Sequence, residues 1–338
     1  MISASALAMF LQVCSIINSF IILAVIIVMA TVKKLQSLFA FRIISFLALN
    51  DLCAYIVFAF GNMAERYGES SFGCQFQAFG LNYFFLSAWC WANATAYTLN
   101  RVIDSATTLK PLNIGPTTMR YFILMFQILP VFPSVMPFFF DAYGNSGAWC
   151  WVKADTENIN YEVIRLCADY LFGYITLGYC IYTYISVWRR LRGFQEQNSN
   201  AASNILSGSF RVLKYYPLIT IWVLSFPSLN RFIGIFSVKL SWLTMMHAIC
   251  VMSMGPLDAL MFFINPTVQR ELKQFLQQKC GVLLPKSLEV AILQSSEPLE
   301  ISPGEQDSKQ LNIQNHADQD IDGSVSEFLP KSEIEITL

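Results

Sequence analysis

Residues 1–32 read MISASALAMFLQVCSIINSFIILAVIIVMATV and contain no Lys, Arg, Asp or Glu. About 20 consecutive apolar residues are enough for a helix to cross the hydrocarbon core of a bilayer. A cleaved signal peptide would instead begin with basic residues and carry a shorter apolar stretch. This stretch therefore predicts a retained membrane-spanning helix.

Composition extends this prediction to most of the chain. Hydrophobic residues make up 55% of the 338 residues and charged residues 13%, whereas soluble globular proteins have about 25% charged residues. Windows of about 19 residues identify further apolar stretches. They predict seven transmembrane helices, at residues 4–32, 41–63, 74–101, 118–140, 161–188, 212–236 and 242–264.

Basic residues between these helices predict the orientation in the membrane. One side carries eleven of them: Lys33, Lys34, Arg42, Arg101, Lys110, Arg120, Arg189, Arg190, Arg192, Arg211 and Lys214. The other side carries five: Arg66, Lys153, Lys239, Arg165 and Arg231. Because Lys and Arg accumulate on the cytoplasmic side, we expect an extracellular N-terminus and a cytoplasmic C-terminus in the plasma membrane.

A short amphipathic segment follows the seventh helix. Apolar residues at Val268, Leu272, Phe275 and Leu276 have the spacing of a helix that lies on the inner membrane surface. Cys280 follows it and is a candidate for palmitoylation. The polar remainder is typical of a disordered tail.

The fold class predicted is therefore an all-α membrane protein. It has a seven-helix bundle at residues 1–264, an amphipathic eighth helix at 265–280 and a disordered cytoplasmic tail at 281–338.

Two of the nine cysteines fall on the predicted extracellular side. Cys74 begins the third helix and Cys150 lies in the second outer loop. In an oxidising compartment we expect them to form a disulfide that holds this loop over the bundle; the alternative is two free thiols.

Two acidic residues lie deep inside predicted helices, where ionisable groups are costly and mark functional sites. Asp51 is about 15 Å and Asp258 about 12 Å from the inner helix ends, at 1.5 Å per residue. Together with Asn50 and Asn265 they predict a sodium or proton site, because two close carboxylates do not both stay ionised without a cation or shared proton. The alternative is that the two aspartates are a pair of hydrogen-bonded packing residues that do not meet.

Near the outer helix ends, several side chains are candidates for binding a ligand. Arg231 would hold a phosphate or carboxylate if it points inward, and would otherwise extend to the membrane interface. Arg165 is a second candidate, although its i, i+4 spacing from Asp169 favours a pair between them. Trp149, Trp151 and Lys153 would cover the same cavity.

Local motifs resemble those of G-protein-coupled receptors. Leu47-Ala-Leu-Asn-Asp51-Leu resembles the Leu-Ala-x-x-Asp-Leu pattern of rhodopsin-like receptors, and Phe226-Pro227 loosely resembles their aromatic-x-Pro motif. Two of their motifs are altered: the third helix ends Asn100-Arg101-Val-Ile-Asp104, and the seventh ends Asn265-Pro266-Thr-Val-Gln269.

Other stretches resemble the slime-mould cyclic AMP receptors and the secretin-like receptors more closely. Trp149-Cys150-Trp151 is similar to the former family's second outer loop, and Leu213-Lys-Tyr-Tyr-Pro217-Leu, leading to Asn230-Arg231, to its sixth helix. The segment from Gly255 to Glu271 is similar to the secretin-like seventh-helix junction. The resemblance covers about residues 1–280 and does not specify the ligand.

The resemblance implies a receptor that activates a heterotrimeric G protein. Arg101, Arg189, Arg190, Arg192, Arg211 and Lys214 would then contact the G protein, and Pro217 and Pro227 would act as hinges of the sixth helix. The tail would be phosphorylated by receptor kinases and bound by arrestin-like proteins. An unknown small ligand and the lipid bilayer complete the expected partners, with no nucleic acid.

Other seven-helix proteins fit the sequence less well. A retinal protein needs a buried lysine for its Schiff base, and residues 242–264 contain none. A membrane metallohydrolase needs several ligands around a metal, but the two histidines are His247 in a helix and His316 in the tail. We therefore expect no enzyme activity, metal or cofactor apart from the sodium considered at Asp51 and Asp258. A transporter or channel remains the alternative to a receptor.

Overall fold

The computed structural model describes residues 4–108, 114–146, 148–153, 159–197, 215–234 and 240–280. Arg211, Lys214 and the predicted tail at 281–338 lie outside these residues. Every structural statement below refers to the described part of the chain.

Seven long helical segments follow one another in the described part. Their bounds are α1 Ala4–Thr31, α3 Phe39–Ala59, α5 Phe72–Thr108, α6 Pro116–Ile128 with α7 Val131–Val135 and η1 Met136–Phe140, α8 Ile159–Arg165 with η2 Leu166–Tyr170 and α9 Leu171–Gln197, α12 Tyr215–Gly234, and α13 Ser241–Ile264. Four are long and apolar enough to cross a membrane by length and composition: Ser5–Thr31, Phe39–Ala59, Pro116–Phe140 and Trp242–Ile264.

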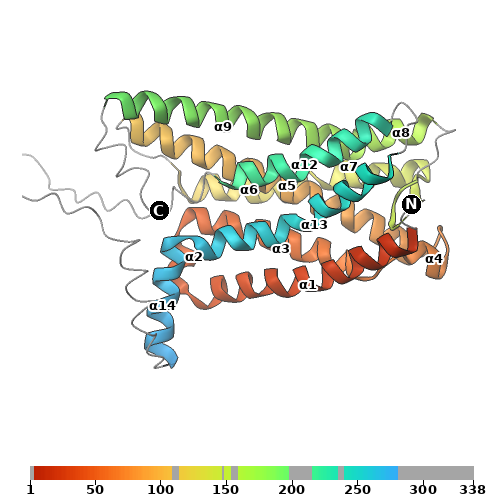
Figure 1. Cartoon of the computed structure of the whole chain (residues 1–338), viewed down its shortest axis with the longest axis horizontal. Helices are drawn as coiled ribbons and strands as arrows, with labels where there is room; N and C mark the ends of the chain where they lie inside the picture. Colours follow the sequence, from red (N-terminus) through yellow and green to blue (C-terminus); the bar gives the residue numbers. More distant parts are fainter. Residues whose placement is uncertain are drawn as a thin grey trace, which may run out of the picture. The chain divides into compact units, whose positions relative to one another are not determined.

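Six of the segments form a closed ring around the core. α1 packs between α13 and α3, α5 packs between α3 and α9, and α12 closes the ring between α9 and α13. α6 and α7 pack on α5 from outside the ring. Figure 1 shows α14 (Pro266–Cys280) beside α2 (Lys33–Ser37) at one end of the bundle, with α4 (Met63–Tyr67) at the other end, where α1 begins.

Two helices continue beyond their predicted membrane ends. The prediction ended the third helix at Arg101 and the fifth at Trp188, but α5 runs to Thr108 and α9 runs to Gln197. Charged residues mark the membrane boundary and do not by themselves break a helix, since Arg and Lys are good helix formers. Both helices therefore extend past the predicted inner boundary.

The fourth helical segment is interrupted by its prolines. α6 ends at Ile128, α7 covers Val131–Val135, and a 3-10 helix covers Met136–Phe140. Each proline lacks the backbone N–H that would continue the ladder. The segment is therefore irregular, and it stays helical by changing its hydrogen-bond pattern.

The break in α13 at Pro256 is repaired by two other helices. Proline leaves the carbonyl of Met252 without its usual helical donor, and the Asn18 side chain donates to this oxygen at 2.7 Å. The Tyr55 hydroxyl accepts from the Gly255 N–H at 2.8 Å and donates to the Val251 carbonyl at 3.3 Å. α1 and α3 thus supply hydrogen-bond partners for backbone groups of α13 around Pro256.

Candidate functional site

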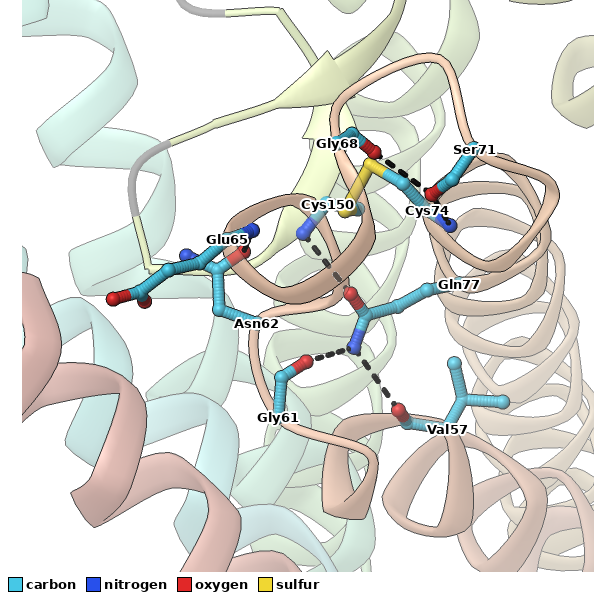
Figure 2. Close-up of a disulfide and its surroundings, with 9 residues drawn as sticks. All are labelled: Val57, Gly61, Asn62, Glu65, Gly68, Ser71, Cys74, Gln77 and Cys150. Atoms are coloured by element: carbon cyan, nitrogen blue, oxygen red, sulfur yellow. Dashed lines mark hydrogen bonds between the residues drawn. A yellow bond between two sulfur atoms is a disulfide. The ribbon is translucent and has the colours of Figure 1, made fainter.

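A two-stranded hairpin lies at the outer end of the predicted topology. Strands β1 (Tyr143–Asn145) and β2 (Cys150–Val152) are antiparallel, with Gly144 paired with Trp151, and both pack against α5. A disulfide joins Cys74 on α5 to Cys150 on β2 (Figure 2). The predicted disulfide is confirmed.

Gln77 ties three segments together beside the disulfide. Its amide nitrogen donates to the carbonyl of Val57 at 3.2 Å and of Gly61 at 2.6 Å, and its amide oxygen accepts from the Cys150 N–H at 3.1 Å (Figure 2). Gln77 itself is fully buried. Because buried polar groups need partners, this one side chain fixes the end of α3, the hairpin and α5 relative to one another.

Further polar contacts hold the hairpin in place. The Tyr143 hydroxyl donates to the Ser134 carbonyl at 2.6 Å, and burial raises the pKa of this phenol, so it stays a donor. Arg165 donates from Nε and Nη2 to the Val152 carbonyl at 3.2 and 2.8 Å, and its guanidinium lies 5.8 Å from the Trp151 ring centre. The hairpin is therefore a fixed roof, which we call the β-roof (residues 143–145 and 150–152).

A cavity opens below the β-roof, between the helices of the ring. It holds about 810 Å³ of empty space, part of it open to solvent. Six aromatic residues on its wall, here called the aromatic wall, come from α3, α5, η2 and the hairpin: Phe58, Phe85, Trp89, Trp149, Trp151 and Tyr170. α12 contributes Leu224, Pro227 and Ser228, and α13 contributes His247. A molecule bound in this cavity would therefore contact α3, α5, α12 and α13 at once.

Four polar residues also line the cavity: Asn82, Asp169, Ser228 and His247. The Asn82 side chain faces Tyr143 and Trp151 at 3.4 Å each, and the His247 ring nitrogen lies 3.1 Å from the Asn230 amide. Asp169 is buried and sits in the π-helical turn η2, whose extra residue rotates the side chains that follow it. Asp169 entered the sequence analysis only as a partner of Arg165, and Asn82 was not selected.

The predicted ligand candidates divide into two groups. Trp149 and Trp151 line the cavity as expected. Lys153 does not line it, because its ammonium contacts the Asp141 carbonyl at 2.7 Å and carboxylate at 3.1 Å. Arg165 is also held away from the cavity, by its bonds to the Val152 carbonyl. The side chain of Arg231 lies outside the described residues, although its backbone belongs to α12, three residues after Ser228.

The structure brings two of the four predicted ion-site residues together. Asp51 and Asp258 are both buried and close enough to interact electrostatically, and Oδ2 of Asp51 has no hydrogen-bond partner among the residues that the structure describes. Asn50 instead donates to the Phe46 carbonyl within α3, at 2.8 Å. Asn265 accepts from the Thr267 N–H at 3.0 Å and so caps the start of α14. These hydrogen bonds direct neither asparagine side chain toward the two carboxylates.

Two of the predicted coupling residues meet at Asp104, near the inner end of α5 and α9. Arg190 reaches Oδ1 of Asp104 at 2.8 Å, and Arg101 lies 4.0 Å from Oδ2 of the same carboxylate. Arg189 and Arg192 are exposed on α9, with Arg192 stacked over Trp188 at 5.6 Å. Arg211 and Lys214 lie outside the described residues, as does the side chain of Cys280. Pro227 lies inside α12, and Pro217 lies in its first described turn.

α14 covers Pro266–Cys280 and is anchored to the first inner loop. Lys34 on α2 reaches Oε1 of Glu271 at 2.9 Å, and the Glu271 side chain is only 4% exposed. Because a buried carboxylate needs compensation, this ion pair holds α14 against the bundle end. Its contact with the membrane stays a prediction.

The ring of helices with the β-roof over its cavity gives the protein a rhodopsin-like fold. Squid rhodopsin shares the fold with a TM-score of 0.62 at 16% identity, covering 89% of this chain and 93% of its own. The model of the slime mold cyclic AMP receptor family matches residues 2–280. The chain belongs to this family, which the sequence motifs predicted.

Two relatives support this assignment. Over 273 residues, 76% of each protein, the chain is 24% identical to G-protein coupled receptor 1 of Arabidopsis thaliana. Over 124 residues, 37% of this chain and 31% of the relative, it is 31% identical to cyclic AMP receptor-like protein A of Dictyostelium discoideum. The family consists of membrane receptors and not enzymes, and it implies a multi-pass protein of the plasma membrane with G-protein partners.

Proposed function

We propose that this protein is a receptor that binds a small extracellular ligand in the cavity below the β-roof and activates a heterotrimeric G protein. The observation that carries the proposal is the cavity itself, because its wall joins residues of α3, α5, α12 and α13. A ligand that contacts these helices more favourably in one arrangement than in another shifts the population toward that arrangement.

α12 is the element that would transmit the change to the inner end. Pro227 lines the cavity and lies inside this helix, where it removes one backbone hydrogen bond and allows a kink. Movement of the inner part of α12 away from α5 would open space beside the accessible Arg101 and Arg190 for a G protein. The proposed orientation has the N-terminus outside and the C-terminus inside, where receptor kinases and arrestin-like proteins would reach the tail.

Guanine-nucleotide exchange tests the proposed function. Reconstituted receptor and purified heterotrimeric G protein from the native host would be mixed with a panel of small metabolites that includes cyclic nucleotides. We expect at least one compound to accelerate exchange. Silence across the panel, together with uptake of a panel compound into the same vesicles, would contradict the receptor and favour a transporter.

We further propose that Asp51 and Asp258 bind a sodium ion or share a proton in the resting receptor. The unpartnered Oδ2 of Asp51 and the nearby Asp258 carboxyl supply the hard oxygen ligands that such a cation prefers. With a cation between them, the two carboxylates no longer repel one another.

Replacing either carboxyl is expected to remove the sodium or pH dependence of basal exchange. Asp51→Asn and Asp258→Asn keep the side-chain size but remove one negative charge. We expect basal exchange of wild type to change about fivefold or more between sodium and choline buffers or between pH 6 and 8, as for a coupling of about 1 kcal/mol. Asn50→Ser serves as the control, because it leaves both carboxyls in place. Unchanged dependence in both aspartate variants would refute the site.

A further inference from the structure

A buried tyrosine on the inner part of α12 lies near the two carboxylates of the proposed ion site. Tyr216 is 4% exposed, and its hydroxyl is close enough to the carboxyl of Asp258 to interact with it electrostatically. Asp258 interacts with Asp51 in the same way. Side chains of α3, α12 and α13 therefore lie near one another in the core, and we call Asp51, Tyr216 and Asp258 the three-helix cluster.

Two buried oxygens of this cluster have no hydrogen-bond partner among the residues that the structure describes. They are the hydroxyl of Tyr216 and Oδ2 of Asp51. Buried polar atoms in folded proteins almost always have a partner, which is a protein group, an ordered water or an ion. A hydroxyl oxygen and a carboxylate oxygen both offer lone pairs. One occupant between the three side chains would therefore be a partner for both oxygens.

A second tyrosine hydroxyl near the two carboxylates is already engaged with the backbone of α13. Tyr55 is close enough to interact electrostatically with both carboxyls. Its hydroxyl, however, donates to the Val251 carbonyl at 3.3 Å and accepts from the Gly255 N–H at 2.8 Å. A phenol has a single proton to donate. Tyr55 therefore holds the proline-containing turn of α13, whereas the Tyr216 hydroxyl is available to the cluster.

We propose that the Tyr216 hydroxyl is a third protein ligand of a sodium ion held by Asp51 and Asp258, and that it ties the inner part of α12 to α3 and α13. This inference rests on the proposed function, in the sodium form of the proposed ion site. Hard cations take neutral and carboxylate oxygens as ligands. An ion that binds three helices favours the arrangement in which all three lie together, which is the resting receptor.

Thermal unfolding in the absence of G protein measures the ion site by itself. Full-length receptor in lipid nanodiscs would be heated over a series of sodium chloride concentrations, with choline chloride keeping the ionic strength constant. Unfolding would be followed with a thiol-reactive dye, because Cys180 and Cys250 are buried free thiols. We expect sodium to raise the unfolding midpoint of wild type by about 2 °C or more, and Asp51→Asn to abolish this shift.

Tyr216→Phe removes one oxygen atom from the cluster and keeps the ring. We expect it to require about fivefold more sodium for half of the shift, as for the loss of one hydrogen-bond-sized contact. This concentration is determined within each protein, so a lower midpoint of the variant in choline does not affect it. Tyr215→Phe is the matched control, because it removes the same atom from a neighbouring residue that is 39% exposed. The control should keep the sodium dependence of wild type.

Basal guanine-nucleotide exchange tests the link to α12. At saturating sodium the ion is bound to both proteins, so a difference between them reports the restraint of α12 and not the affinity. We expect sodium to lower basal exchange of wild type and Tyr215→Phe about fivefold, and that of Tyr216→Phe less than about twofold.

Three outcomes would overturn the proposal. Equal sodium requirements of wild type and Tyr216→Phe would show that the hydroxyl is not a ligand, and would leave the two-aspartate site standing. A sodium shift that is absent from wild type, or that Asp51→Asn keeps, would refute the sodium site itself. Undiminished suppression of basal exchange in Tyr216→Phe at saturating sodium would refute the restraint of α12. Failure of the receptor function is separate, because it appears as silence across the metabolite panel.

Discussion

Replacing Gln77 with leucine is expected to lower the unfolding midpoint by about 5–10 °C and to remove most of the receptor from the cell surface. The carbonyls of Val57 and Gly61 and the N–H of Cys150 would lose their partner in a buried place. Each buried polar group left without a partner costs about 1–3 kcal/mol. The combined loss is comparable to that of the disulfide, which closes a loop worth about 4 kcal/mol in the chain-entropy model.

Three variants separate the polar bridge from the disulfide. Gln75→Leu changes a half-buried glutamine on the same helix and should be close to wild type. Gln77→Glu, protonated in this buried place, keeps an acceptor for the Cys150 N–H and one donor for a carbonyl, so its midpoint should lie between those of wild type and Gln77→Leu. The double variant Cys74→Ser, Cys150→Ser removes the disulfide alone. The thiol-dye unfolding assay and surface biotinylation measure these effects, and a Gln77→Leu midpoint within 1–2 °C of wild type would contradict the role of Gln77.

Replacing Gly255 with valine is expected to cost about 3–5 kcal/mol of stability, through overpacking and lost hydrogen bonds together. A Cβ at this position would lie 2.6 Å from Cε2 of Tyr55 and 3.2 Å from Cδ1 of Ile22. Tyr55 is 1% exposed, so its ring has little space into which it can move. Displacing its hydroxyl would also open the repaired turn of α13.

A double-mutant cycle identifies the cause of this loss. Gly178→Val is the matched control, because a Cβ there meets nothing within 4 Å. Tyr55→Leu removes the ring, so Gly255→Val should cost less in that background than in wild type. Equal costs in both backgrounds, measured by thermal unfolding, would show that contact with Tyr55 does not limit residue 255.

The sequence predicted those features that depend on local composition. Apolar runs located the seven helical segments. Cys74 and Cys150 both fall on the predicted extracellular side, and this shared side predicted their disulfide. Counting residues from the helix ends placed Asp51 and Asp258 at similar depth, and the structure brings them close. These inferences need only length, polarity and the rise of a helix.

The cavity required information that no local pattern contains. Which residues face inward depends on the rotation of each helix, and the π-helical turn at Asp169 alters that rotation by one residue. The role of Gln77 depends on three carbonyl and amide groups far apart in sequence. Lys153 was a reasonable ligand candidate by position, but the exposed Asp141 carboxylate and carbonyl bind it outside the cavity.

The altered motifs also have a structural explanation. Where rhodopsin-like receptors carry an acidic residue before the arginine, this chain has Asn100, and the acidic residue follows as Asp104. Asp104 lies one turn further along α5 and contacts both Arg101 and Arg190. A shift of one helical turn thus keeps the arginine next to a carboxylate, as expected for residues three apart on a helix.

Guanine-nucleotide exchange with matched cavity variants tests the account most directly. A Cβ at Gly173 would lie 3.2 Å from the Trp89 ring on the cavity wall, whereas a Cβ at Gly178 on the same helix meets nothing within 4 Å. Wild type, Gly173→Leu and Gly178→Leu would be reconstituted with G protein and the compound of the metabolite panel that most accelerates exchange by wild type. The account predicts that the compound accelerates exchange by wild type and Gly178→Leu but not by Gly173→Leu. Acceleration that persists in Gly173→Leu would contradict a receptor that signals from this cavity.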